Sequence, residues 1–333
     1  MRTLIFLLLL SIQTRYLLAQ SQICQNGKLD ARVALALKTT LKELPASPTA
    51  SVEQIRDVQL PVLPFPRSDV QILTITADNI PIHVYNPTHS KDLPILIYYH
   101  PGGFVTPFLP FMQYDCWRQA KAYRALVIAV DYRVAPEHKF PAAVNDAFHA
   151  FQWVITHAQT IGGDTSRIMV MGLSAGGNLA AVVCQKAQQA GLGHKIKLQV
   201  LHCPSTDHPQ HSARYPSYQQ YASGYFLTKA FCLYSIQTYA PGIDTYHPEV
   251  APIQRQSLSG LPPVLMLTAE FDPFRDEGYA YYERLRQAGV PGWYHCFSGQ
   301  IHCLLGLPAN AKQLQQVDEL IVKAMGSVWG HKR

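Results

Sequence analysis

The residues with the clearest chemical potential are a serine and its glycine neighbours at 172–178, Gly-Leu-Ser-Ala-Gly-Gly-Asn. An apolar run at 168–171 precedes Ser174 and a second one at 179–184 follows it, which predicts a strand and then a helix. The glycines two residues before and two after the serine permit a tight turn that holds the hydroxyl at the strand's end. The free amides that begin such a helix face any negative charge that forms there. The pattern predicts a nucleophilic serine.

A serine that attacks a carbonyl needs donors for the resulting oxyanion, and a glycine-rich loop upstream meets that need. A buried strand is predicted over 96–99, and it runs into His-Pro-Gly-Gly-Phe at 100–104. Paired glycines let the backbone approach a substrate carbonyl closely. We therefore expect the amides of Gly102, Gly103 and Ala175 to form an oxyanion hole. An ordinary glycine turn is the alternative interpretation of this loop.

The acid and base that activate a serine are expected in loops that follow late strands. Asp272 follows a predicted strand over 263–269, and His302 follows another over 292–297. The chain order Ser174, Asp272, His302 is that of α/β-hydrolases rather than of the two major serine-protease classes. His302 would accept the serine's proton and return it to the leaving group, while Asp272 would fix its tautomer and stabilise the imidazolium.

Neighbouring residues offer alternatives for these roles. His295 is a second candidate base, although its place within a predicted strand favours packing. Asp276 is a second candidate acid at the start of a predicted helix, where negative charge is favourable anyway. Four neighbours could suggest a metal cluster: His295, Cys296, His302 and Cys303. No C-x-x-C or H-x-x-x-H spacing supports one, so we expect no metal site.

Five motifs follow one another in a specific order. They are the 100–104 loop, Asp-Tyr-Arg-Val-Ala-Pro-Glu-His-Lys-Phe-Pro-Ala-Ala at 131–143, the 172–178 stretch, Ala-Glu-Phe-Asp-Pro-Phe-Arg-Asp-Glu-Gly at 269–278, and Ile-His at 301–302. Together they resemble the hormone-sensitive-lipase-like family of esterases, from about residue 73 to about residue 307. The resemblance implies that Ser174 is the nucleophile, Asp272 the acid and His302 the base. It also implies that no metal or organic cofactor is needed.

Three positions depart from the pattern of this family. Pro101 replaces the first of three glycines in the oxyanion loop, and proline has no N–H group, but Gly102 and Gly103 remain as donors. Leu173 stands where the family often has aspartate, which leaves the sub-family and the fine substrate preference open. Cys-Leu at 303–304 replaces the usual Gly-Phe after the histidine, and this changes the local packing.

The remaining pattern predicts an α/β-hydrolase fold with a mostly parallel eight-stranded sheet flanked by helices. Strands are expected over 70–76, 80–85, 94–99, 126–131, 167–172, 197–203, 263–269 and 292–297. Helices are expected over 29–44, 142–158, 177–191, 277–288 and 310–325. The resemblance implies a catalytic domain over 69–333 and a helical cap over its pocket, built from an N-terminal segment at 20–68 and an insertion at about 205–250.

Composition limits the function classes. The chain has 333 residues, of which 48% are hydrophobic and 15% charged, so it can bury a large core. The net charge of +6 comes from scattered residues, and we expect no nucleic-acid partner. Residues 1–19 resemble a signal peptide with cleavage after Ala19, which predicts a periplasmic or secreted protein. Arg15 interrupts the apolar run and argues against a membrane anchor. The alternative is a cytoplasmic protein with an apolar N-terminal helix.

Seven cysteines would remain after that cleavage. Because the number is odd, at least one thiol stays free if the others pair, and the connectivity does not follow from sequence. Cys184, Cys203 and Cys232 lie in apolar or helix-like stretches, so we expect them to pack as small hydrophobic residues.

These features together predict a serine carboxylesterase that hydrolyses short- to medium-chain acyl esters of small molecules through an acyl-enzyme. The chain-length preference rests on the resemblance alone. An amidase or peptidase with the same triad, and a lipase, remain alternatives. A non-catalytic ligand receptor on this fold is a further alternative, but the mark of that class is loss of the triad histidine, and His302 is present. Homodimer formation is left open.

Overall fold

The computed structural model describes residues 23–44, 51–57, 63–87 and 91–329. The predicted signal peptide at 1–19 lies outside these residues, as do parts of the 20–68 segment. Within the described part of the chain, no helix is long and apolar enough to cross a membrane.

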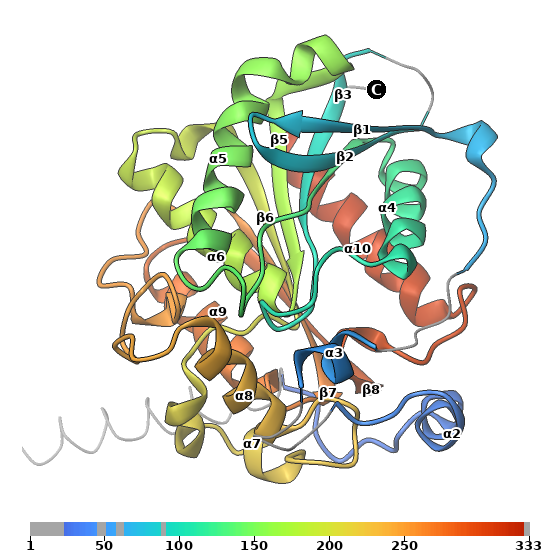
Figure 1. Cartoon of the computed structure of the whole chain (residues 1–333), viewed down its shortest axis with the longest axis vertical. Coiled ribbons are helices and arrows are strands. Elements are labelled where there is room, and N and C mark those ends of the chain that lie inside the picture. The colour runs from blue at the N-terminus through green and yellow to red at the C-terminus, as the bar shows by residue number, and fades with distance from the viewer. Residues whose placement is uncertain (1–22, 45–50, 58–62, 88–90, 330–333) are drawn as a thin grey trace, which may run out of the picture.

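A single eight-stranded sheet forms the centre of the molecule (Figure 1). Its spatial order is β1-β2-β4-β3-β5-β6-β7-β8, in which β1 and β2 are antiparallel to their neighbours and β3 to β8 run parallel. These directions confirm the predicted mostly parallel sheet. Each of the eight strands also lies within a few residues of its predicted place. The strands are β1 (Gln71–Ala77), β2 (Ile80–Asn86), β3 (Leu93–Tyr99), β4 (Leu126–Val130), β5 (Gly163–Leu173), β6 (Ile196–His202), β7 (Val264–Phe271) and β8 (Gly292–Ile301).

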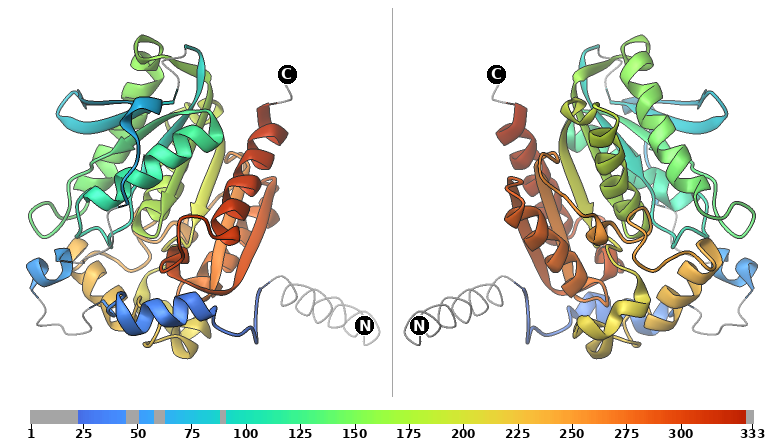
Figure 2. Two further views of the ribbon diagram at one scale, coloured as in Figure 1. Left: turned by 90° about the vertical axis from the view of Figure 1, so that its right-hand side faces the viewer. Right: turned by 90° about the vertical axis from the view of Figure 1, so that its left-hand side faces the viewer.

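Helices cover both faces of the sheet, as Figure 2 shows. The side chains of β3 alternate between two cores: Ile95 and Ile97 pack with α5 (Ala142–His157) and α6 (Ala175–Gln189), whereas Leu96 packs on the other face. The helices on the first face are α5, α6 and α9 (Arg275–Gln287), and those on the second are α4 (Pro110–Tyr123) and α10 (Lys312–Trp329). A parallel sheet buried on both faces is the arrangement that the run of apolar strands predicts.

The helix α4, which packs against the sheet, is not among the helices predicted from the sequence. α4 lies between β3 and β4, and its buried side chains recur at helical spacing, at Met112, Cys116, Ala120 and Tyr123. That spacing is the signal that could have identified it. The predicted helix over 29–44 is also shorter in the structure, since α2 (Ala31–Thr39) ends at Thr39.

Short helices from two distant parts of the chain gather beyond the carboxyl ends of the strands (Figure 1). α2 and α3 (Val52–Arg56) come from the N-terminal segment, and α7 (Ser217–Gln220) and α8 (Lys229–Tyr239) come from the 205–250 insertion. The two parts contact each other directly, because the amide of Leu44 donates to the carbonyl of Phe226 at 3.0 Å. They therefore form a joint cover over that end of the sheet.

A disulfide between Cys24 and Cys296 joins the N-terminal segment to β8, with a Cα–Cα distance of 5.6 Å. Beside it, the carboxylate of Glu270 accepts hydrogen bonds from the amides of Gly27 and Gly299, at 2.5 and 2.9 Å. The remaining five cysteines are unpaired: Cys116, Cys184, Cys203, Cys232 and Cys303. The predicted burial of Cys184, Cys203 and Cys232 is confirmed.

Candidate active site

Ser174 occupies a sharp turn between β5 and α6, with φ 56° and ψ −119°. This conformation is unusual for a non-glycine residue and is sustained by close packing around it. A Cβ atom at Gly172 would collide with the backbone of Gly176, and one at Gly176 would collide with the carbonyl oxygen of Tyr99. The two glycines therefore permit the turn and also bring the start of α6 against the end of β3.

The loop after β3 lies beside this turn and carries left-handed backbone at both of its glycines, with φ 133° at Gly102 and 60° at Gly103. A Cβ atom at Gly102 would lie 2.7 Å from Cβ of Thr106, so the loop is too tight for a side chain there. The amides of Gly102, Gly103 and Ala175 have no acceptor among the described residues. Three free donors thus lie in the walls of the cavity that contains Ser174.

His100 and Tyr132 support that loop from behind. The Tyr132 hydroxyl donates to the carbonyl oxygen of His100 at 2.7 Å, and the two rings stack at a centroid distance of 4.0 Å. Burial lowers the pKa of His100 to about 4, so the ring is neutral at physiological pH. His100 is a support of the loop rather than a proton carrier.

Asp272 and His302 form a buried pair. Nδ1 of His302 donates to Oδ2 of Asp272 at 2.7 Å, and the other carboxylate oxygen accepts from the amide of Phe274 at 2.9 Å. Burial alone would lower the pKa of His302, but the negative charge of Asp272, with the neighbouring thiol of Cys303, raises it overall. Nε2 of His302 is buried and has no hydrogen-bond partner among the described residues. The imidazole is oriented by one nitrogen and free at the other.

Ser174 and His302 line the same cavity, which has a volume of about 120 Å³. A second and smaller cavity, of about 20 Å³, also has Ser174 in its wall and is lined by Ala175, Ser205 and Phe274. The sequence did not predict the apolar residues of the cover that close these cavities: Leu44, Phe226, Leu227 and Phe231. For Phe226, Leu227 and Phe231, the signal in the sequence is an apolar cluster within the 205–250 insertion.

The alternative candidates lie elsewhere. His295 is on β8 and faces Gln316 of α10, with 3.3 Å between their side-chain nitrogens, so it is separate from Asp272. Asp276 accepts from the amide of Ser217 and pairs with Arg275, which assigns its carboxylate to the packing of the cover. The four-residue metal cluster considered above does not form, because Cys296 is bound in the disulfide.

Arg56, in the N-terminal segment, forms hydrogen bonds with the loops that follow β3 and β4. Its Nε donates to the carbonyl oxygen of Val105 at 2.8 Å and its Nη2 to that of Ala135 at 3.0 Å, while Glu137 binds the same guanidinium.

We expect Arg56→Met to raise KM for an ester about 10-fold with a smaller effect on kcat, because charge-assisted hydrogen bonds of Arg56 hold the cover over the cavity. Steady-state kinetics tests this. The matched control is Arg286→Met, which removes an exposed Arg–Glu pair on α9. An unchanged KM in Arg56→Met would contradict the expectation.

Comparison with known proteins identifies the family to which this chain belongs. The sequence model of the α/β hydrolase fold matches residues 96–306, more than half of the chain. The chain belongs to this family. It is 38% identical to the esterase LipI of Mycobacterium tuberculosis, covering 76% of this chain and 80% of the relative. It is 35% identical to the carboxylesterase NlhH of the same organism, covering 83% and 91% of the two chains.

A solved structure supports the same placement. The hyperthermophilic esterase from the archaeon Pyrobaculum calidifontis superposes with a TM-score of 0.72 at 36% identity, covering 79% of this chain and 86% of that one. The predicted membership of the hormone-sensitive-lipase-like α/β hydrolases is confirmed, as is the predicted enzyme class of carboxylic ester hydrolases at the level of the family.

Proposed function

We propose that this α/β hydrolase is a serine carboxylesterase that cleaves short- to medium-chain acyl esters through an acyl-enzyme at Ser174. His302 is the base and Asp272 its orienting acid, and the amides of Gly102, Gly103 and Ala175 bind the oxyanion. The observation that carries the proposal is the 2.7 Å hydrogen bond between Asp272 and His302. Nε2 of His302 has no partner among the described residues, and His302 lines the same cavity as Ser174.

The reaction runs in two halves. In the first, Nε2 of His302 takes the proton of Ser174 Oγ as that oxygen bonds to the ester carbonyl carbon, and the free amides hold the resulting oxyanion. The imidazolium then gives its proton to the departing alkoxide, which leaves as the alcohol. In the second half, a water loses its proton to His302 and attacks the acyl-enzyme, and the proton returns to Ser174 as the acid is released.

The dimensions of the site favour small substrates. Ser174 lines two cavities of about 120 and 20 Å³, and apolar side chains of the cover form part of the wall of both. An ester seated at Ser174 can place its acyl and alcohol groups in different cavities. The smaller cavity limits the length of one of them.

Hydrolysis of p-nitrophenyl esters from acetate to palmitate tests the function. We expect kcat/KM to peak at short to medium acyl chains, because both cavities at Ser174 are small. A peak at palmitate would instead support a lipase. Turnover of p-nitroanilides without turnover of esters would support an amidase, and no turnover of either by folded protein would contradict an enzymatic function.

The pH dependence of kcat/KM tests the Asp272–His302 pair. Catalysis needs neutral His302, so activity falls as the pH drops through the pKa of this residue. Because Asp272 raises that pKa, we expect the acidic limb of the wild-type profile above pH 6.5. Asp272→Asn removes the charge, so it should move the limb to lower pH and reduce the plateau by about 10³–10⁴-fold. Identical limbs in both proteins would contradict the pairing.

We further propose that the segment at 20–68 and the insertion at 205–250 act together as the cap of a catalytic domain at 69–333. The contact of Leu44 with Phe226 and the lining of the cavity by both segments support this. We also propose export with cleavage after Ala19. The disulfide at Cys24 supports an oxidising compartment, since disulfides persist there and are rare in the cytosol.

A further inference from the structure

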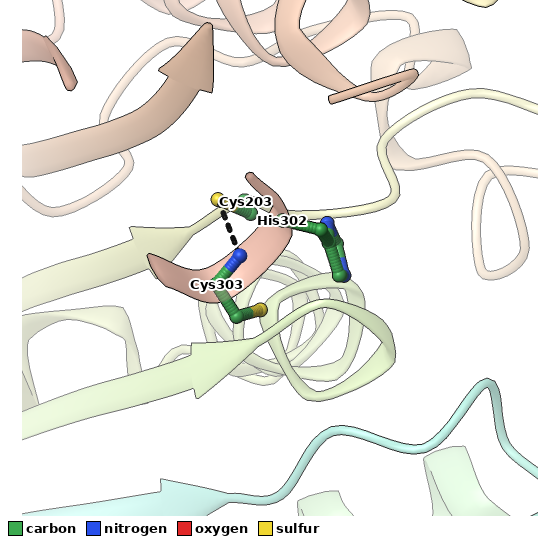
Figure 3. A group of neighbouring side chains, drawn as sticks. All are labelled: Cys203, His302 and Cys303. Atoms are coloured by element: carbon green, nitrogen blue, oxygen red, sulfur yellow. Dashed lines mark hydrogen bonds between the residues drawn. The ribbon is translucent and has the colours of Figure 1, made fainter. Parts of the chain in front are cut away.

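Two thiols adjoin His302, and the proposed mechanism uses neither of them. Cys203 directly follows β6, and Cys303 lies with His302 in the turn after β8, as Figure 3 shows. The amide of Cys303 donates to Sγ of Cys203 at 3.3 Å. One ligand atom from each of the three residues, two sulfurs and an imidazole nitrogen, lies within 4.8 Å of the others.

This set of donors is the one that soft and borderline divalent cations prefer. Zn²⁺ binds thiolate sulfur and imidazole nitrogen, and its ligand atoms in a tetrahedral site are about 3.5–3.8 Å apart. The three atoms thus need to close in by about 1 Å. Cys303 has the freedom to do this, because it is only partly buried and lies at the wall of two adjoining cavities.

A cation can also reach the cluster. Cys303 lines both the cavity at Ser174 and the outer cavity that continues from it, between α2 and the start of α4. Nε2 of His302 is buried and has no hydrogen-bond partner among the described residues, so this nitrogen is free to bind a metal ion. A water in the cavity can complete the fourth position of a tetrahedron.

We propose that Cys203, His302 and Cys303 form a Zn²⁺ site whose occupation stops ester hydrolysis. Binding forms two Zn–S bonds and one Zn–N bond and releases one proton from each thiol to solvent. Either ring nitrogen gives the same result: coordination through Nε2 occupies the proton acceptor, and coordination through Nδ1 removes the imidazole from Asp272. The inhibition rests on the proposed role of His302, whereas the binding does not.

Metal binding is tested on Ser174→Ala protein, purified anaerobically, so that the result is independent of activity. We expect one Zn²⁺ per chain by equilibrium dialysis, and a thiolate-to-metal charge-transfer absorption when Co²⁺ is added instead. Adding Cys303→Ser or Cys203→Ala should remove both signals. Cys184→Ala, a buried thiol on α6 away from the cluster, is the matched control and should keep them. Equal binding by all of these proteins, or none by the parent, would overturn the site.

Inhibition is tested on the active enzyme with p-nitrophenyl butyrate, each protein compared with its own rate in metal-free buffer. We expect the Zn²⁺ concentration for half-inhibition to rise at least about 10-fold in Cys303→Ser and Cys203→Ala but not in Cys184→Ala. A chelator should restore the rate. Inhibition of equal potency in all four proteins, or loss of activity that the chelator does not reverse, would overturn the proposal. Absence of turnover without metal would instead count against the proposed function and leave the binding result standing.

Discussion

Replacing Ser174 with alanine is expected to reduce kcat/KM for p-nitrophenyl butyrate by about 10⁴-fold or more, because the residue that forms the acyl-enzyme is gone. The fold should persist. The substitution removes only one hydroxyl group, and the backbone turn at this position depends on Gly172 and Gly176 rather than on the serine side chain. We therefore expect Tm to change by no more than about 2 °C. Steady-state kinetics and a thermal melt measure the two quantities.

The control for this variant is Ser166→Ala on the same strand. Its hydroxyl is outside the cavity and donates only to Asp164. We expect its kcat/KM to stay within about 2-fold of wild type. A Ser174→Ala protein with normal rates would remove the basis of the proposed mechanism. Loss of activity together with unfolding would leave the chemistry undecided, and the thermal melt separates that case.

Replacing His302 is expected to have the second-largest effect, a loss of about 10³-fold or more in kcat/KM, because His302 is the residue proposed to take the proton of the Ser174 hydroxyl. His302→Gln is the informative variant, since its amide can still donate to Asp272 and so avoids leaving a buried carboxylate unpaired. Steady-state kinetics with p-nitrophenyl butyrate gives the value.

His295→Ala is the matched comparison, a histidine seven positions earlier in the chain that contacts α10 instead of the cavity. We expect it to retain at least half of the wild-type kcat/KM. If His295→Ala lost activity and His302→Gln kept it, the role of base would pass to His295.

Much of the fold follows from local patterns in the sequence. The inner strands are predictable because they are short apolar runs bounded by turn residues, as at 93–99 and 264–271, whereas β1 shows the alternation of apolar and polar residues typical of an edge strand. The turn at Ser174 is predictable for a different reason: the glycines on either side of it are required by backbone contacts that no other residue permits. The proximity of Asp272 and His302 is predictable because each directly follows a late strand, and the carboxyl ends of parallel strands lie at the same edge of a sheet.

Contacts between distant segments do not follow in the same way. Cys24 pairs with Cys296 across a separation of 272 residues, and cysteine spacing does not encode such a partner. The hydrogen bonds of Arg56 with the carbonyl oxygens of Val105 and Ala135 are not encoded by local sequence either, nor is the contact of Cys203 with Cys303. Each of these depends on how the cover and the strand ends meet in three dimensions, which local propensity does not determine.

The central claim is that Ser174 is the residue acylated during turnover, and covalent labelling tests it most directly. Wild-type protein is incubated with diethyl p-nitrophenyl phosphate, which phosphorylates activated serines, and the adduct is located by peptide mass spectrometry. We predict one diethylphosphoryl group per chain, on Ser174, with none on Ser174→Ala protein and little on His302→Gln protein. A stoichiometric adduct on another residue, or none on wild-type protein that hydrolyses esters, would contradict the account.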